Sequence, residues 1–176
     1  MAGKGRDTKA RMEEAAIRLF AERGVEGTSV RDIAAAVGVT EAALYRHLTS
    51  KDEFVAGLFA DRYVALGRQV HAAQEGLAGF AARMRAMVEA CCRLHDRDPA
   101  LFRFLLIVQH RALPSLAVGE PNPGDVIGAV ILDGIREGAV TVADARLATA
   151  IVFGCVLQPA VFLLYGRLDG GLTDHA

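Results

Sequence analysis

The chain has 176 residues, 52% of them hydrophobic, which is enough to bury the core of one compact domain or of two small ones. Its formal net charge of -1 excludes a basic field over the whole surface. The charge is unevenly placed, because residues 1–51 hold nine Lys/Arg and seven Asp/Glu, a sum of +2 that leaves -3 for the remainder. Such a distribution suits DNA binding by one face of the N-terminal part.

The cysteines and the N-terminal residues indicate the cellular compartment in which the protein is found. Three cysteines, of which Cys91 and Cys92 are adjacent and Cys155 stands apart, argue against a disulfide framework. Residues 1–11 are polar and lack the apolar core of a signal peptide. We therefore expect a cytoplasmic protein in a reducing environment. Residues 1–6 are interpreted as a flexible basic arm ahead of the first domain, and the cations of this N-terminus are Lys4, Arg6, Lys9 and Arg11.

Helix is predicted for nearly the whole chain, because Ala, Leu, Arg and Glu dominate it and no stretch alternates apolar and polar residues for long. Gly24 is expected to end the first helix, and residues 114–124, with three of the five prolines, to form a loop. A kink is expected at Pro159. In chain order the predicted helices span about 7–23, 30–37, 40–48, 50–70, 77–95, 99–113, 126–137 and 143–165.

The stretch from Thr28 to Lys51, TSVRDIAAAVGVTEAALYRHLTSK, carries the functional signal. Two short helices with capping residues Ser29 and Thr40 are joined by a tight turn at Gly38, which is the spacing of a helix-turn-helix. An ordinary helical hairpin in a bundle has a similar pattern. DNA binding is favoured because the second helix is only about two turns long and because Lys51 lies in the first turn of the next helix, where the helix dipole attracts an anion such as phosphate.

At these residues the chain resembles the TetR/AcrR family of one-component repressors. The segment AAIRLFAERGVEGTSVRDIAAAVGVTEAALYRHLTSKDEF follows the family's pattern, including the G-V-T turn and the L-Y-x-H segment, and departs from it at Leu48, where the family usually has Phe. The resemblance implies an all-α fold. Residues 7–62 would form a three-helix DNA-binding domain with its recognition helix at about 40–47, and residues 63–176 a helical ligand-binding and dimerisation domain.

The resemblance also implies roles for individual residues. Glu41, Ala42 and Ala43 would lie deepest in the major groove, while Leu44 would belong to the core. Arg31 would reach the DNA backbone or a base, and Arg46 is the one strong donor on this face. The residues implied to bind phosphate are Thr28 or Ser29, Thr40, Tyr45, His47 and Lys51.

The last predicted helix contains 19 residues without a charge, 147–165, a length that can span a bilayer. Gln158 and Pro159 near its middle argue against a membrane span. Paired with its neighbour across a two-fold axis, it would instead form a four-helix interface in a homodimer, as the resemblance also implies. Small residues that allow close approach of these helices are Gly128, Gly134, Ala150 and Gly154.

An apolar pocket for a small, largely hydrophobic effector is expected between helices of the C-terminal half. Candidate ligand-binding residues are Phe102, Gln109, His110, Gln158 and Tyr165.

Neither an enzyme nor a metal site nor a cofactor is predicted. Cys91 and His95 share one helical face, but no further ligands accompany them, so both are interpreted as core residues. No Ser/His/Asp pattern, phosphate-binding loop or carboxylate pair offers a starting point for an active site. The sequence thus indicates a homodimeric repressor that a small effector releases from its operator in double-stranded DNA. The alternative is a helical interaction or membrane-associated dimer without DNA binding.

Overall fold

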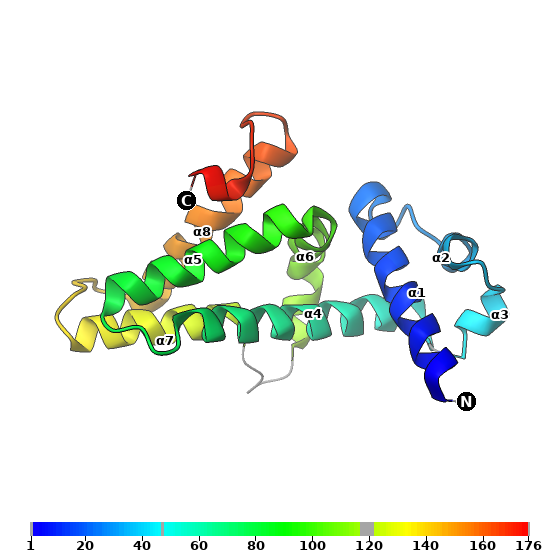
Figure 1. Ribbon diagram of the computed structural model, residues 1–176, viewed down its shortest axis with the longest axis horizontal. Helices are drawn as coiled ribbons and strands as arrows, with labels where there is room; N and C mark the ends of the chain where they lie inside the picture. Colours follow the sequence, from blue (N-terminus) through cyan, green and yellow to red (C-terminus); the bar gives the residue numbers. More distant parts are fainter. Residues whose placement is uncertain (1, 47, 117–121, 176) are drawn as a thin grey trace. The chain divides into compact units, whose positions relative to one another are not determined.

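The computed structural model describes residues 2–46, 48–116 and 122–175, and within these ranges every regular element is a helix (Figure 1). This confirms the all-α prediction. The α-helices are α1 (Ala2–Arg23), α2 (Val30–Val37), α3 (Glu41–Leu44), α4 (Lys51–Gln74), α5 (Phe80–Arg97), α6 (Pro99–Ala112), α7 (Pro123–Arg136) and α8 (Ala145–Leu164), and the 3-10 turns are η1 (Leu113–Ser115) and η2 (Leu172–His175).

The chain divides into two compact units. The N-terminal unit combines Met1–Arg62 with Ala100–Leu116, and the C-terminal unit combines Tyr63–Pro99 with Ala117–Ala176. The boundary after Arg62 coincides with the predicted end of the DNA-binding domain. Helix α6 differs from the prediction, because the sequence placed it within residues 63–176 whereas nearly all of it belongs to the N-terminal unit.

An aromatic pair explains why α6 joins the N-terminal unit. Phe20 on α1 and Phe104 on α6 stack with their ring centroids 5.9 Å apart, and both side chains are fully buried. Such pairs contribute about 0.5–1.5 kcal/mol beyond the burial of their area. Phe20 and Phe104 are 84 residues apart along the chain, so the local sequence of α6 does not indicate this partner.

Helix α1 begins at Ala2, so residues 2–6 of the predicted arm are helical. Once buried residues such as Met12 anchor the later turns, each further residue adds one backbone hydrogen bond at little cost. Two cations that follow residue 6 are engaged within the N-terminal unit. Lys9 pairs with Glu13 at 3.6 Å, and the Arg11 guanidinium donates to the Val37 carbonyl at 2.8 Å.

In the C-terminal unit, α5, α7 and α8 pack around an apolar core. Arg83 of α5 donates to Gln74 at the end of α4 (2.7 Å) and pairs with Asp133 of α7 (3.1 Å). Gly134 lets α7 approach α5 closely, since a Cβ at this position would lie 2.5 Å from the ring of Phe80. Gly134 therefore serves packing within this chain. The buried apolar residues of this core include Met87, Cys91, Cys92, Ile127, Val130, Ile131, Val156 and Ala160.

The adjacent thiols are buried in the core, which confirms the interpretation of Cys91. Cys91 and Cys92 are free and buried, whereas Cys155 is exposed on α8. Burial, with a smaller effect of Cys92, raises the pKa of Cys91 to about 12. A thiol of this kind stays protonated near neutral pH and is a poor nucleophile.

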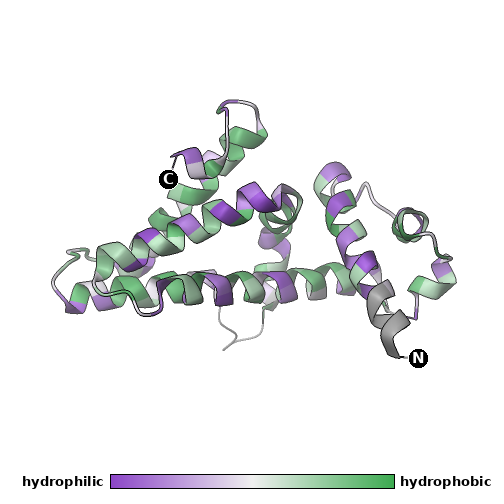
Figure 2. Cartoon of the chain, viewed as in Figure 1, coloured by the Kyte–Doolittle hydropathy of each residue, from purple (hydrophilic) through white to green (hydrophobic). Residues whose placement is uncertain are grey.

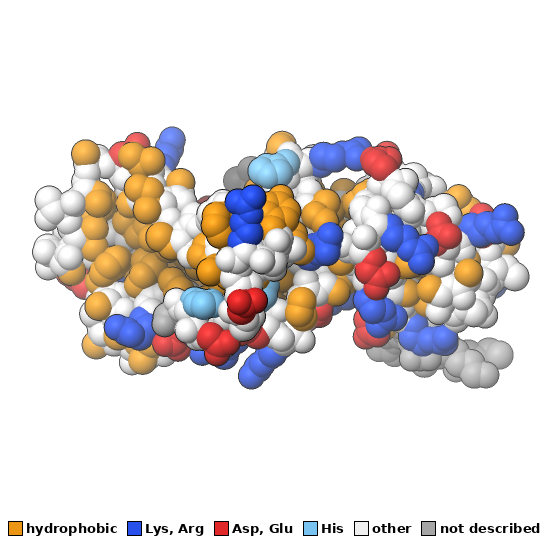
Figure 3. Space-filling model, turned by 90° about the horizontal axis from the view of Figure 1, so that it is seen from above, with side chains coloured by type: hydrophobic (Ala, Val, Ile, Leu, Met, Phe, Trp, Pro, Cys, Tyr) orange, Lys and Arg blue, Asp and Glu red, His pale blue; other side chains and the backbone are white. Residues whose placement is uncertain are grey.

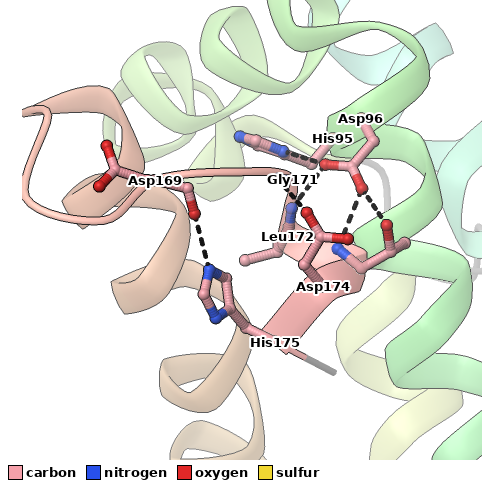
Figure 4. A network of polar contacts seen from close by, with 8 residues as sticks. His95, Asp96, Asp169, Gly171, Leu172, Asp174 and His175 are labelled. Carbon is pink, nitrogen blue, oxygen red and sulfur yellow. Dashed lines mark hydrogen bonds and ion pairs between the residues drawn. The ribbon is translucent and has the colours of Figure 1, made fainter.

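Asp96, near the end of α5, fastens the C-terminal turn η2 (Figure 4). Its carboxylate accepts hydrogen bonds from the backbone N–H groups of Leu172 (2.7 Å) and Thr173 (2.9 Å) and from the Thr173 hydroxyl, and it lies 2.8 Å from Nδ1 of His95. Burial alone would raise the pKa of Asp96, but the hydrogen bonds from Thr173, His95 and Leu172 outweigh it and hold the pKa well below its usual range. The ionised carboxylate therefore stabilises the turn.

We predict that Asp96→Asn lowers the free energy of unfolding by about 1–3 kcal/mol at pH 7, because a charged acceptor of several hydrogen bonds is lost. Since the pKa is depressed in the folded state, the wild-type advantage is fully present above the unfolded pKa of about 3.9 and is lost as the pH falls through the folded value. Urea unfolding of both proteins between pH 7 and pH 3 should give stabilities that converge toward acid. Asp169→Asn, an exposed carboxylate nearby, is the control. A difference that stayed constant with pH would contradict this role of Asp96.

Helix α8 is apolar along much of its visible length (Figure 2). It is long and apolar enough to cross a bilayer by length and composition, yet cores of globular proteins contain such helices as well. Only Val156 and Ala160 of its residues are buried. The helix continues through Pro159 to Leu164, so this proline does not end it.

Candidate nucleic-acid interface

Helix α2 begins after the predicted cap Ser29, which forms a capping box with Asp32. The Ser29 hydroxyl accepts a hydrogen bond from the Asp32 N–H (3.1 Å), and the Asp32 carboxylate accepts one from the Ser29 N–H (2.8 Å). Hydrogen bonds from the Ser29 side chain and then its backbone hold the pKa of Asp32 below its ordinary value. The ionised carboxylate lies in the first turn of α2, where the helix dipole favours a negative charge.

Gly38 reverses the chain between α2 and α3. Its φ of 71° lies in the left-handed region, and its N–H donates to the Ala35 carbonyl at 3.2 Å. Residues with a Cβ adopt this conformation only with strain. Because α2 and α3 pack on each other across this turn (Figure 1), the structure confirms the predicted helix-turn-helix.

Helix α3 is shorter than the predicted recognition helix at 40–47. It spans Glu41–Leu44, with Thr40 as N-cap and Tyr45 as C-cap. The Thr40 hydroxyl accepts a hydrogen bond from the Ala43 N–H at 3.3 Å. Leu44 is fully buried, as expected for a core residue. His47 lies outside the described residues.

The other candidates at α2 and α3 face solvent. Two guanidinium groups, a phenol and two hydroxyl groups can donate to phosphates, a carboxylate can accept a hydrogen bond from a base edge, and alanine methyl groups can pack against thymine methyl groups. The exposed residues are Ser29, Arg31, Thr40, Glu41, Ala42, Tyr45 and Arg46, and Ala43 is half-buried.

Thr28 is a correction to the predicted set. Its side chain is 1% exposed, and its hydroxyl donates to the Gly24 carbonyl at 2.9 Å, with the Leu19 carbonyl at 3.3 Å. The hydroxyl thus satisfies carbonyl groups at the end of α1, so it is not presented to phosphate. Ser29, and not Thr28, caps α2.

Lys51 also has partners other than those predicted. Its ammonium donates to the carbonyls of Val25 (2.9 Å) and Thr28 (3.2 Å). The carbonyl groups of this turn attract the cation that the start of α4 repels. Lys51 therefore ties α4 to the turn before α2.

Two interactions of this region have no local sequence signal. Arg11 reaches across from α1 to the end of α2, and Arg111 of α6 pairs with Glu26 in the turn after α1 at 2.8 Å. Both join residues that are distant along the chain, and neither residue type nor spacing indicates the partner.

The comparisons with known proteins agree with this geometry. Residues 14–58 match the bacterial regulatory proteins of the tetR family. The HTH-type transcriptional repressor Rv3405c of Mycobacterium tuberculosis is 30% identical over 144 residues, which cover 82% of this chain and 67% of that protein. The chain belongs to the TetR family of bacterial regulatory proteins.

Other relatives cover different shares of this TetR-family chain. The transcriptional repressor KstR2 of Mycobacterium tuberculosis is 42% identical over 55 residues, which cover 31% of this chain and only 28% of that protein. The crystal structure of FadR from Bacillus subtilis in complex with stearoyl-CoA has the same fold, with a TM-score of 0.76 at 18% identity, and the match covers 94% of this chain and 92% of FadR.

The five predicted ligand-binding residues of this TetR-family chain are not brought together within either unit. Phe102, Gln109 and His110 lie on α6 in the N-terminal unit, where Phe102 is buried, Gln109 donates to the Leu106 carbonyl and His110 is exposed. Gln158 and Tyr165 are exposed on the C-terminal unit.

Lys51→Met is predicted to lower the free energy of unfolding by about 1–3 kcal/mol, because two carbonyls of a partly buried turn lose a charged donor. Arg46→Ala, which removes an exposed cation of the same unit, should stay within about 0.5 kcal/mol of wild type. Thermal and urea unfolding measure both. Equal stability of the Lys51 variant and wild type would show that the contacts of Lys51 with the turn contribute nothing.

Proposed function

We propose that this TetR-family chain is a transcriptional repressor that binds an operator in double-stranded DNA and that a small, largely hydrophobic effector releases from it. The observation that supports the proposal most strongly is the arrangement of α3. Thr40 caps this helix, Leu44 anchors it in the core, and its outer residues are exposed. A helix fits the major groove, where base edges can be read. The role is regulatory and cytoplasmic, without an enzymatic activity or a cofactor, in line with relatives that are transcriptional regulators.

In this proposal the base contacts and the phosphate contacts come from different residues. Glu41, Ala42 and Ala43 face the base edges, where Glu41 accepts from cytosine and the methyl groups contact thymine. Hydrogen-bond donors around these three residues position the protein on the DNA phosphate backbone and do not read the base sequence. These phosphate contacts are assigned to Ser29, Arg31, Thr40, Tyr45 and Arg46.

The DNA prediction separates these two roles. Selection from random duplexes should yield a near-palindromic site with half-sites about 34–36 Å apart, and binding should weaken with salt. Arg31→Ala should weaken binding to every duplex and flatten the log–log salt slope by about 0.9 per lost phosphate contact. Ala43→Leu should change preference among operator variants, at about 1–3 kcal/mol for each disturbed base pair.

Titrations against the selected site and a scrambled duplex, each at two salt concentrations, measure these effects. Arg103→Ala on α6 and Ala81→Leu on α5 are matched exposed controls that should bind as wild type. If Ala43→Leu bound all duplexes as wild type does, α3 would not lie in the groove.

We further propose that α8 pairs with α8 of a second copy in a homodimer. Its exposed residues Leu147, Ile151, Gly154, Gln158 and Phe162 recur every three or four positions and so form one stripe, opposite the buried Val156 and Ala160. Hydrophobic side chains gather over the C-terminal unit at the left of Figure 3. Large exposed apolar patches mark interfaces, and helices paired in this way form four-helix contacts.

Ile151→Arg should convert a dimer to monomers, because a charge would be buried at the interface. Ile151 is 58% exposed in the single chain, so the substitution leaves the fold of the subunit intact. Leu77→Arg, outside the stripe and also exposed, should stay dimeric. Sedimentation at micromolar concentration measures the mass. A monomeric wild type would remove this interface, and partition of the wild type into membranes would favour the alternative role of α8.

The effector would act by preferring one arrangement of the dimer. A ligand that binds better when the two recognition helices are wrongly spaced shifts the population away from the DNA-binding form. The stearoyl-CoA bound to FadR supports a hydrophobic ligand for this fold. The effector is assigned to the C-terminal unit. None of the five predicted ligand-binding residues is assigned to its site, because these residues do not meet within either unit.

A further inference from the structure

The N-terminal unit contains a cavity that the proposed DNA contacts do not use. It lies between the turn that follows α1, the beginning of α4 and the last turns of α6, and its volume is about 390 Å³. This volume falls in the range of about 300–1,000 Å³ that is typical of small-molecule sites. All the residues that line it belong to the N-terminal unit.

The walls of this cavity are largely apolar. Val55 of α4 and Val108 of α6 are buried lining residues, and Ile107 of α6 is 41% exposed. A large aliphatic side chain left open to water beside a concave surface favours an apolar occupant. The occupant would cover Ile107 and rest on the two valines.

The lining of the cavity carries charges of both signs. Arg23 and Arg111 line it together with Glu26 and Asp52. The two guanidinium groups are the lining groups that can hold an anionic head group.

One cation is available for that head group at little cost. Arg111 pairs with Glu26 at 2.8 Å, but both side chains are mostly exposed, at 69% and 80%. Exposed pairs of this kind contribute little to stability. A ligand carboxylate can take the place of the Glu26 carboxylate on the guanidinium, in the bidentate geometry that arginine offers, while Glu26 returns to water.

We propose that this cavity binds a small amphipathic carboxylate, with its apolar chain on Val55, Ile107 and Val108 and its carboxylate on Arg111. Such a ligand joins α6 to the turn at residues 24–28, whose carbonyls Thr28 and Lys51 hold. The site lies in the N-terminal unit, apart from the effector site proposed for the C-terminal unit. Its existence does not depend on DNA binding.

The test uses the full chain and sodium octanoate as probe, with octanol as the neutral probe of the same length. Ile107 is the isoleucine of the cavity wall, so its methyl resonance in isoleucine-labelled protein, assigned with Ile107→Val, reports on this site. Octanoate should shift this resonance in a saturable way, and octanol should bind about tenfold more weakly. The methyl of Ile33, which is buried in α2, should not shift.

Two variants on exposed positions test the two halves of the ligand. Ala56→Trp fills the cavity and should abolish the shift of Ile107, while Arg111→Ala should weaken octanoate binding about tenfold. Arg103→Ala, an exposed arginine of α6 outside the cavity, should bind as wild type. Circular dichroism confirms that each variant is folded. An Ile107 methyl that did not respond to octanoate, or one that responded equally in wild type and Ala56→Trp, would overturn the proposal.

Discussion

A helix of four residues cannot hold its shape in water, because nucleation fixes several residues for its first hydrogen bond. The position of α3 therefore rests on the burial of Leu44, helped by the Thr40 cap. One apolar side chain thus fixes the position of a short helix, and the other residues of this helix remain available to contact DNA. This explains why the exposed positions of α3 carry small or polar residues: they contribute little to its stability.

The surface that Leu44 anchors depends in turn on the loop before α2. Thr28 and Lys51 satisfy the carbonyl groups of that loop from two directions, so they set where Ser29 begins α2. Through Phe104 and Arg111, α6 contacts α1 and the same loop. The proposed DNA-binding surface is therefore part of a unit that is larger than a three-helix domain.

Local features of this unit could be predicted from the sequence. The capping box at Ser29 and Asp32, the left-handed Gly38 and the burial of Leu44 all depend on residues close together along the chain. The hydrogen-bond partners of Thr28 and Lys51 could not be predicted, since both side chains can donate equally well to phosphate and to carbonyl groups. The start of α7 also has a local sequence signal, because Asn122 caps the helix and Pro123 begins it, three residues before the predicted start at 126.

The claim that the exposed surface of α2 and α3 meets DNA is tested most directly by hydrogen exchange of the wild-type protein with and without its selected duplex. Amides in peptides that cover residues 29–31 and 40–46 should exchange more slowly in the complex, while those of α5 should not change. The reverse pattern, with α3 unaffected and protection elsewhere in the chain, would contradict the placement of α3 in the major groove.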